Sequence, residues 1–388
     1  MRHTARLSIA VLLAGRFALA SAAEPAKAPR RWKMDSFLIS HWSFPKEGPR
    51  LKQFAEAGFN TVIAVPEELP ACQAKGWRAL LAVRAEEVPA YVHNPIVWGY
   101  FLLDEPARKN IRYETLVPTM EAFHRLDPSR PAYINLNEKD DPQAFVKLLR
   151  PRVLSYDYYQ WWSGSEPFFP LLERFRRAAL DADLPLLCWV EAVAVPHGPA
   201  PADNEARVRQ SVYAALAYGA KGIQWWGWRA DSPDCAKING ELKVLGPELV
   251  KLRSGDVFHT APLPPQTRPV PGHAWVQSST AGLVLGLFRN EEGTDFLLLA
   301  NRDWKTARTA TLTFAVPVMR VSRFDRQTGR WIDTTLALEN DRPTLAQRLA
   351  PGDGVLLRVA KEMSVWLPRQ ELPDRQVSCD SPRLVSPN

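Results

Sequence analysis

Apolar and polar residues alternate in blocks between residues 36 and 253. Short apolar runs, rich in β-branched and aromatic residues, are separated by amphipathic runs with helical spacing. The apolar runs are nearly continuous, which is typical of parallel strands that are buried on both faces. Eight strands are expected, at residues 37–42, 60–65, 79–83, 97–103, 132–137, 153–158, 186–192 and 222–228. Eight strands that alternate with helices predict a (β/α)8 TIM barrel over residues 36–253.

The predicted helices are clearest late in this region. Residues 167–183 and 204–218 each place their apolar side chains on one face. Asp203 is a suitable N-cap for the second of these helices, and Gly219 is suited to end it. Between the third and fourth strands the helical pattern is short and weak.

The pattern changes after residue 253. Residues 254–273 are predicted to be a linker, because they contain Pro262, Pro264, Pro265, Pro269 and Pro271. Short alternating strands separated by turn signals then follow, at residues 274–278, 282–288, 294–301, 309–314, 320–325 and 355–359. Residues 274–360 are therefore expected to form an antiparallel β-sandwich, followed by an irregular tail over residues 361–388.

The first 22 residues have the features of a signal peptide. A basic start with Arg2 and Arg6 precedes a mostly apolar stretch and the small residues Ala20-Ser21-Ala22. The stretch is too short to anchor the chain in a bilayer, so we expect no membrane insertion and a secreted or periplasmic protein. Removing the three Arg of this segment lowers the formal net charge from +7 to +4. A mild charge without a Lys/Arg run argues against nucleic acid as the partner, and the oligomeric state is left open.

Motifs for several kinds of chemistry are missing from the sequence. The seven His are scattered without HxH or HExxH spacing, which argues against a metal-dependent hydrolase. No glycine-rich phosphate loop follows a strand and no GxSxG elbow occurs, which argues against a nucleotide cofactor and against a serine hydrolase. No cofactor is expected. Cys188 is predicted to be a buried thiol, and a disulfide among Cys72, Cys235 and Cys379 is left open.

Polar residues at the carboxyl ends of the predicted strands are the candidates for the active site. In a (β/α)8 barrel these ends form one rim, which carries the catalytic groups. The rim positions combine carboxylates, amides and aromatic rings, and the chain contains 14 Trp. That mixture suits a polyhydroxylated ligand with apolar ring faces. The candidates for substrate binding are His41, Asp104, Asn135, Asn137, Asp157, Tyr158, Trp189 and Trp226.

Two glutamates are the candidates for catalysis. Glu105 follows the apolar run Val97–Leu103 and the acid Asp104, and charged groups at the end of a buried strand are costly unless a site uses them. Glu191 ends the seventh predicted strand in the same way. Each acid also has a purely structural interpretation. Asp104 could cap the following turn while Glu105 is simply solvated. Glu191 could be a surface acid in a loop, or the partner of an arginine on the rim.

The segments 99–106, 154–159 and 217–223 resemble the clan of barrel glycoside hydrolases that retain anomeric configuration, near the family 42 β-galactosidases. The resemblance spans roughly residues 36–253. It implies that Glu105, at the end of strand 4, is the acid/base and that Glu191, at the end of strand 7, is the nucleophile. Asp104 stands where the clan usually has Asn, so Asn135 or Asn137 would have to contact the sugar 2-hydroxyl.

A two-carboxylate retaining mechanism would therefore cleave an O-glycosidic bond of an oligosaccharide, polysaccharide or glycoside. One acid protonates the leaving oxygen, and the other attacks the anomeric carbon. The rival is a barrel protein that binds carbohydrate without catalysis, and a Glu191 that points away from the site would favour it. If Glu191 is dispensable, Asp157 or Glu138 becomes the candidate nucleophile.

Overall fold

The structure is a computed structural model that describes residues 32–361 except 43, 46–48, 196 and 230–232. The predicted signal peptide and nearly all of the predicted tail lie outside the described residues. Eight parallel strands close into a barrel in chain order. They are β1 (Leu38–His41), β2 (Thr61–Ala64), β3 (Arg78–Leu81), β4 (Val97–Asp104), β5 (Ala132–Leu136), β6 (Leu154–Asp157), β7 (Leu186–Glu191) and β8 (Ala220–Trp226). The prediction of a (β/α)8 barrel is confirmed.

The barrel is filled by apolar side chains near the amino ends of its strands. Residues from strands that are not neighbours can touch only inside a closed barrel, and such a cluster comprises Leu38, Leu80, Trp98, Tyr133, Val153 and Leu187. A larger cluster lies between the barrel strands and the helices that surround them. Burial on both faces explains why the strands are apolar without alternation. The acidic residues of these strands therefore lie at the carboxyl ends, beyond the apolar interior.

Helices cover the outside of the barrel. They are α1 (Pro49–Glu56), α2 (Leu69–Lys75), α3 (Tyr113–Leu126), α4 (Pro142–Leu149), α5 (Gln160–Ser163), α6 (Phe168–Asp181), α7 (Asn204–Ala217) and α8 (Asp234–Leu249). A 3₁₀ helix, η2 (Ala85–Ala90), stands where the sequence pattern was weak, and a second, η1 (Pro66–Glu68), precedes α2. Gly219 follows α7 with a positive φ of 94°. Asp203, predicted to cap α7, makes no side-chain cap and instead binds Arg207 at 2.8 Å.

Two antiparallel sheets form the second part of the structure. The six-stranded sheet has the order β15-β14-β18-β12-β11-β9, and the four-stranded sheet the order β10-β13-β17-β16. Their strands are β9 (Arg253–His259), β10 (Val276–Ser278), β11 (Leu283–Arg289), β12 (Asp295–Asn301), β13 (Arg308–Phe314), β14 (Val318–Asp325), β15 (Arg330–Asp333), β16 (Ala337–Glu339), β17 (Arg342–Leu349) and β18 (Gly354–Lys361). A separate hydrophobic core lies between the sheets. The predicted antiparallel sandwich is confirmed.

One strand of the sandwich lies where a linker was predicted. Residues 253–259 form β9, which pairs with β11 at the edge of the six-stranded sheet. The carboxyl half of β9, Val257–His259, is buried, whereas its amino half is mostly exposed. The proline-containing connection therefore begins only after residue 259.

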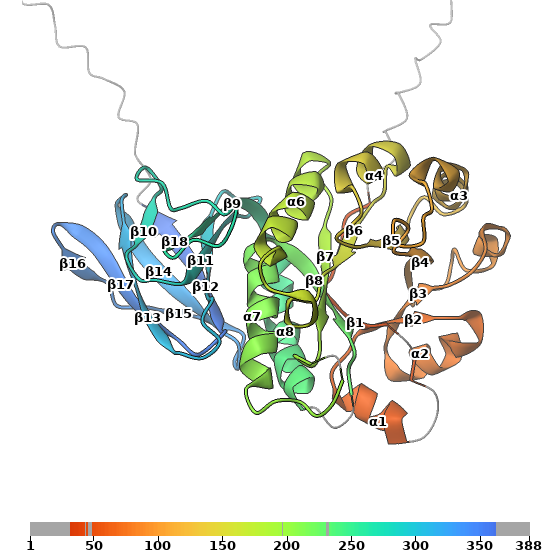
Figure 1. Ribbon diagram of the computed structural model, residues 1–388, viewed down its shortest axis with the longest axis horizontal. Helices are drawn as coiled ribbons and strands as arrows, with labels where there is room; N and C mark the ends of the chain where they lie inside the picture. Colours follow the sequence, from red (N-terminus) through yellow and green to blue (C-terminus); the bar gives the residue numbers. More distant parts are fainter. Residues whose placement is uncertain (1–31, 43, 46–48, 196, 230–232, 362–388) are drawn as a thin grey trace, which may run out of the picture.

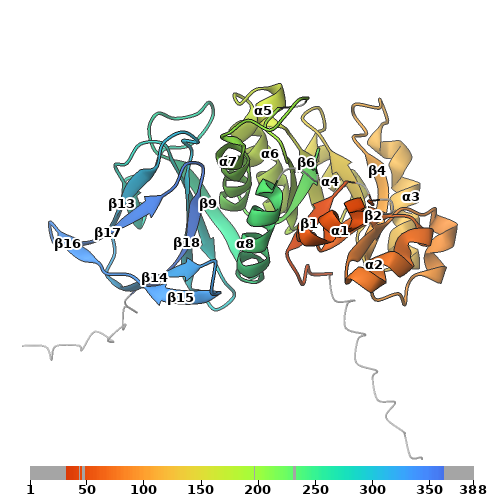
Figure 2. The same cartoon turned by 90° about the horizontal axis from the view of Figure 1, so that it is seen from below.

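Helix α7 packs against the sandwich as well as the barrel. Figures 1 and 2 both show α7 and α8 between the two parts. Two glycines of the sandwich allow this close approach: a side chain at Gly286 would overlap the carbonyl of Ala217, and one at Gly352 would overlap that of Ala206. The interface is a direct backbone contact at these points.

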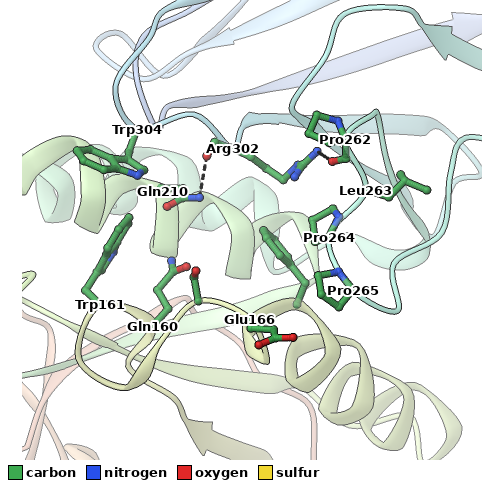
Figure 3. Close-up of a pocket in the computed structure, with 12 residues that line it drawn as sticks. Gln160, Trp161, Glu166, Gln210, Pro262, Leu263, Pro264, Pro265, Arg302 and Trp304 are labelled. Carbon is green, nitrogen blue, oxygen red and sulfur yellow. Dashed lines mark hydrogen bonds between the residues drawn. The ribbon is translucent and has the colours of Figure 1, made fainter.

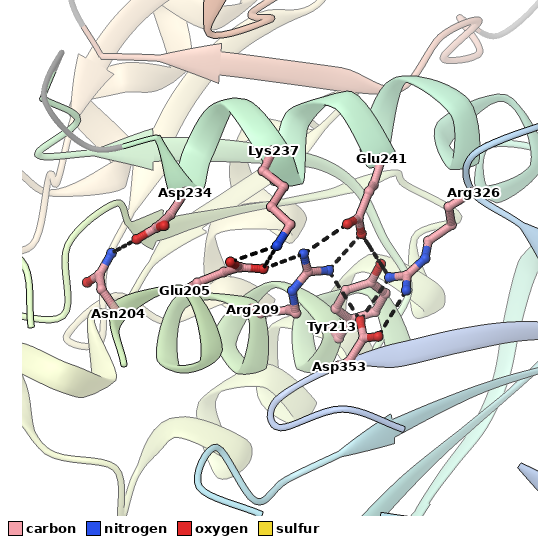
Figure 4. Close-up of polar contacts among 9 residues, drawn as sticks. All are labelled: Asn204, Glu205, Arg209, Tyr213, Asp234, Lys237, Glu241, Arg326 and Asp353. Carbon is pink, nitrogen blue, oxygen red and sulfur yellow. Dashed lines mark hydrogen bonds and ion pairs between the residues drawn. The ribbon is translucent and has the colours of Figure 1, made fainter. Parts of the chain in front are cut away.

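Ion pairs connect the same surfaces. Arg326 donates two hydrogen bonds to Asp353, at 2.8 and 2.9 Å, and one to Glu241 of α8 at 2.8 Å. Arg209 of α7 donates to both oxygens of Glu241 at 2.7 and 2.9 Å and to Asp353 at 3.2 Å. Figure 4 shows these side chains converging between the two helices and the sandwich. Glu205 and Lys237 extend the network along the helices.

Three cysteines are described, and they are free and buried: Cys72, Cys188 and Cys235. The predicted thiol at Cys188 is thus present, and Cys379 lies outside the described residues. Over the described part of the chain, no helix has the length and apolar character needed to cross a membrane.

Candidate functional site

Glu105 lies directly after β4 at the carboxyl end of the barrel. Its backbone N–H donates to the carbonyl of Asn135 at 2.8 Å, and its φ is 47°. This left-handed conformation costs a non-glycine residue about 1–2 kcal/mol. Glu105 is 9% exposed, so its carboxyl group is largely withdrawn from water. Strain and burial at one acidic residue make the end of β4 a candidate for a functional site.

Charged groups from two loops surround the Glu105 carboxyl. The Arg108 guanidinium lies 3.1 Å from Glu105 and 3.3 Å from Glu138. Burial raises the pKa of Glu105 above the usual value for a glutamate, and the charges of Asp104 and Glu138 raise it further. Arg108 and the neighbouring Asn137 side chain act in the opposite direction without reversing the shift. The result is a carboxyl group that holds its proton more tightly than a solvated glutamate.

Asp157 is a second buried acid on the same rim. It ends β6, is 7% exposed and accepts a hydrogen bond from the Tyr159 hydroxyl at 3.2 Å. Burial raises its pKa well above the ordinary value, and the charges of Glu105 and Asp104 add to the shift. Glu105 and Asp157 therefore influence each other's ionisation across the mouth of the barrel.

Glu191 ends β7 and is completely buried. On this strand Leu187 belongs to the cluster inside the barrel, so by alternation Glu191 also has the inward register. Its Oε1 accepts a hydrogen bond from the backbone N–H of Trp161 at 2.9 Å, whereas its buried Oε2 has no hydrogen-bond partner in the described part of the chain. Burial raises the pKa of Glu191 to about 8, against the lowering effect of the Trp161 N–H.

A buried hydrogen-bond network lies below the acids. The Trp189 indole donates to the Tyr133 hydroxyl at 2.9 Å, which lies 2.7 Å from Ser155 Oγ. Ser155 also bonds to Asn135, whose amide donates to Asp104 at 3.2 Å. The network links four neighbouring strands, β4 to β7, so the floor of the site is fixed by the barrel itself.

Aromatic rings stand beside these groups. The Trp42 ring packs edge-on against the rings of Trp189 and Trp226, with ring centroids 5.3 and 5.7 Å apart. Trp226 is 36% exposed, whereas the adjacent Trp225 is buried and donates to Asn239 of α8 at 2.8 Å. The alternation of a strand thus directs Trp226 to the rim and Trp225 to the helical layer.

The structure does not bring every candidate into this group. The His41 ring packs against Phe54, Phe59 and Trp228, in the layer between the strands and the helices. The Tyr158 hydroxyl donates to the carbonyl of Gly164 at 2.8 Å, so its ring turns to the loop that follows α5. His41 takes an outward position on β1, and Tyr158, directly after β6, turns away from the acids as well. The substrate-binding roles predicted for these two residues find no support in their placement.

Asn137 is a buried candidate whose side chain acts on the Glu105 carboxyl group. It is fully buried, and its Oδ1 accepts the backbone N–H of Lys139 at 2.8 Å. Among the described residues, its Nδ2 has no partner at good hydrogen-bond geometry. Since the same side chain lowers the pKa of Glu105, it lies close enough to act on that carboxyl group.

Arg108 and Tyr159 are the site residues that sequence analysis missed as participants. Arg108 is three positions after Glu105, and that spacing is the signal that could have identified it. Tyr159 is the neighbour of a candidate and belongs to the site through its bond to Asp157. Within the described residues, no group of three or more His, Cys, Asp or Glu side chains is arranged to hold a metal ion.

No protein-family model and no curated protein sequence matches the chain. Among solved structures, a GH27 β-L-arabinopyranosidase from Geobacillus stearothermophilus is similar with a TM-score of 0.51 and 10% identity, covering 85% of this chain and 98% of that one. A GH51 arabinofuranosidase from Xanthomonas axonopodis pv. citri is similar with a TM-score of 0.44 and 10% identity, covering 84% and 93%. Both of those proteins are glycosidases, and at this identity the similarity to them is one of fold.

Proposed function

We propose that the chain is a glycoside hydrolase that cleaves O-glycosidic bonds with Glu105 as the acid/base and Glu191 as the nucleophile. The observation that carries the proposal is the buried Glu105 carboxyl group, with its raised pKa, on the carboxyl rim of a closed barrel. An acid catalyst must carry a proton near neutral pH, and burial beside Asp104 and Glu138 favours that state. Trp42 and Trp226 supply flat apolar surfaces for a sugar ring at the carboxyl ends of β1 and β8.

The nucleophile must be ionised when it attacks the anomeric carbon. Glu191 is held through Oε1 by the Trp161 N–H, and its second oxygen has no hydrogen-bond partner among the described residues, which suits an atom that forms a bond to substrate. With a pKa of about 8, Glu191 is mostly protonated in the free protein at neutral pH. Catalysis needs an ionised Glu191 together with a protonated Glu105, so turnover should have a bell-shaped pH dependence whose two limbs belong to this pair of acids.

Two further parts of the proposal rest on the sequence and on similarity. The glycosidase names of the structural neighbours agree with a carbohydrate substrate, and the resemblance to the clan near family 42 agrees with retention of configuration. The basic and apolar N-terminal segment supports export, which N-terminal sequencing of the protein from its native host tests. An intact Met1 on that product would contradict export.

A panel of nitrophenyl glycosides tests the hydrolase proposal. Wild type should release nitrophenol from at least one of them, and Glu105→Gln and Glu191→Gln should each lower turnover by about 10²–10⁴-fold. Glu339→Gln, in the exposed strand β16, is the matched control and should retain full turnover. Azide should restore turnover of Glu191→Gln with an inverted glycosyl azide as the product, because azide replaces the missing nucleophile.

The alternative is a barrel protein that binds carbohydrate without cleaving it. Binding of a glycoside without release of nitrophenol by the wild type, and without hydrolysis of oligosaccharides, would favour that alternative. If Glu191→Gln keeps full turnover while Asp157→Asn loses it, Asp157 is the nucleophile.

A further inference from the structure

A cavity of about 540 Å³ lies between the barrel and the sandwich. Its walls come from α5, α6 and α7 on one side, and from the connection after β9 and the loop after β12 on the other. The volume falls within the range of about 300–1,000 Å³ that is typical of small-ligand pockets.

The cavity has apolar surfaces at both ends. Trp161 and Trp304 close one end with ring centroids 5.5 Å apart, and Leu263 and the adjacent prolines form the other. Figure 3 shows the Gln210 side chain between the two tryptophans and the proline segment. Flat apolar walls at opposite ends suit a ligand with apolar ring faces.

A polar side chain on the cavity wall has an unpaired atom. Gln210 is 8% exposed, and its amide nitrogen donates to the carbonyl of Arg302 at 2.8 Å. Its Oε1 is buried behind the wall and has no hydrogen-bond partner among the described residues. An unpaired buried acceptor costs about 1–3 kcal/mol, so a ligand that turns the Gln210 amide toward the cavity and donates a hydroxyl to Oε1 would recover a bond that the fold leaves unmade.

The charges around the cavity favour a neutral ligand. The Arg302 guanidinium donates to the carbonyls of Thr260 at 2.6 Å and Pro262 at 2.7 Å. The Arg207 guanidinium stacks on Trp304 at 3.8 Å and forms an ion pair with Asp203 at 2.8 Å. Both cations are thus engaged within the protein, and the exposed carboxylate of Glu166 on the cavity wall disfavours an anion.

We propose that this cavity is a second binding site, separate from the acids of the barrel mouth, for a neutral saccharide of one or two rings. Apolar walls and an unpaired acceptor match the apolar faces and hydroxyl donors of a sugar. The choice of a saccharide over other neutral ring compounds rests on the proposed function. The site itself does not require hydrolysis.

Isothermal titration of the full chain with lactose, cellobiose and maltose tests the site, using the Glu105→Gln background to prevent turnover. At least one disaccharide should bind, and Trp304→Ala should weaken that binding at least tenfold. Leu263→Arg, which fills the cavity from its exposed wall, should do the same and provides a second variant. Trp275→Ala is the matched control, because Trp275 packs on Phe314 in the sandwich and does not line the cavity.

The outcomes separate this site from the proposed hydrolase. Failure of all three disaccharides to bind, or binding unchanged by both Trp304→Ala and Leu263→Arg, overturns the second site. Binding that depends on Trp304 in a chain that cleaves no glycoside supports the second site while the hydrolase proposal fails. If the chain hydrolyses a glycoside but its disaccharide binding does not depend on Trp304, the hydrolase proposal is supported and the second site is not.

Discussion

Replacing Glu191 with Gln should make the folded protein less sensitive to rising pH. The Glu191 carboxyl is completely buried and accepts a hydrogen bond from the backbone N–H of Trp161. Burial raises its pKa from 4.5 to about 8. A group whose pKa is higher in the folded state contributes stability that is fully present below its unfolded pKa and is lost as the pH rises through its folded pKa. Wild type should therefore lose stability between about pH 4.5 and pH 8 through this residue.

The size of the effect follows from the shift. One pKa unit corresponds to about 1.4 kcal/mol, so linkage gives a loss of about 4 kcal/mol between pH 5 and pH 9. Gln at position 191 can still accept the Trp161 N–H, but it places an unpaired amide N–H₂ in the core. That cost is about 1–3 kcal/mol at every pH, so it displaces the whole stability curve without changing its slope.

Urea unfolding followed by circular dichroism at pH 5, 7 and 9 measures both curves. The difference in unfolding free energy between Glu191→Gln and wild type should change by about 4 kcal/mol in favour of the variant from pH 5 to pH 9. The unfolding free energy of Glu339→Gln, on the exposed β16, should change with pH in parallel with that of wild type. Parallel curves for Glu191→Gln and wild type would show that the Glu191 carboxyl is not held in a low-dielectric environment, and would refute the reasoning.

The remaining predictions concern the acids of the rim and the domain interface. Arg108→Met should raise the pKa of Glu105 and move one limb of the kcat/KM profile to higher pH, whereas Asp104→Asn should move the same limb to lower pH; equal profiles would contradict the charge effects assigned to Glu105. Asp353→Asn should destabilise the protein by about 2–4 kcal/mol in urea unfolding, because it leaves Arg326 and Arg209 with fewer partners in a mostly buried network. Asp256→Asn removes an exposed pair with Arg268 and should cost no more than about 1 kcal/mol, so similar losses for both variants would contradict a special role for Asp353.

The barrel strands could be predicted because their environment leaves a strong mark on the sequence. Each is buried on both faces, so each reads as an apolar run, and the predicted ends lie within two residues of those observed. The sandwich was harder. Strand β9 begins with polar residues and is held by pairing with β11, and β16 is exposed throughout. Neither strand shows the alternation that sequence analysis depends on.

The acids of the site could be predicted from their position at strand ends, but their surroundings could not. Sequence alternation shows that neighbouring residues face opposite ways, yet it does not fix which one faces inward. His41 and Tyr158 proved to take the outward positions. Arg108 reaches Glu105 because the chain turns through a left-handed residue after β4, and the backbone of Trp161 reaches Glu191 because α5 follows β6 directly. Such local conformations depend on tertiary contacts.

Turnover of an oligosaccharide by Glu105→Gln beside wild type tests the role of Glu105 most directly, and NMR follows the product configuration on an aryl glycoside. Wild type should cleave a substrate from the nitrophenyl panel with retention of anomeric configuration. Glu105→Gln should keep its fold but lose most of the turnover on the oligosaccharide, whose leaving group needs a proton. Full turnover of that oligosaccharide by Glu105→Gln would contradict the assignment of Glu105 as the acid/base.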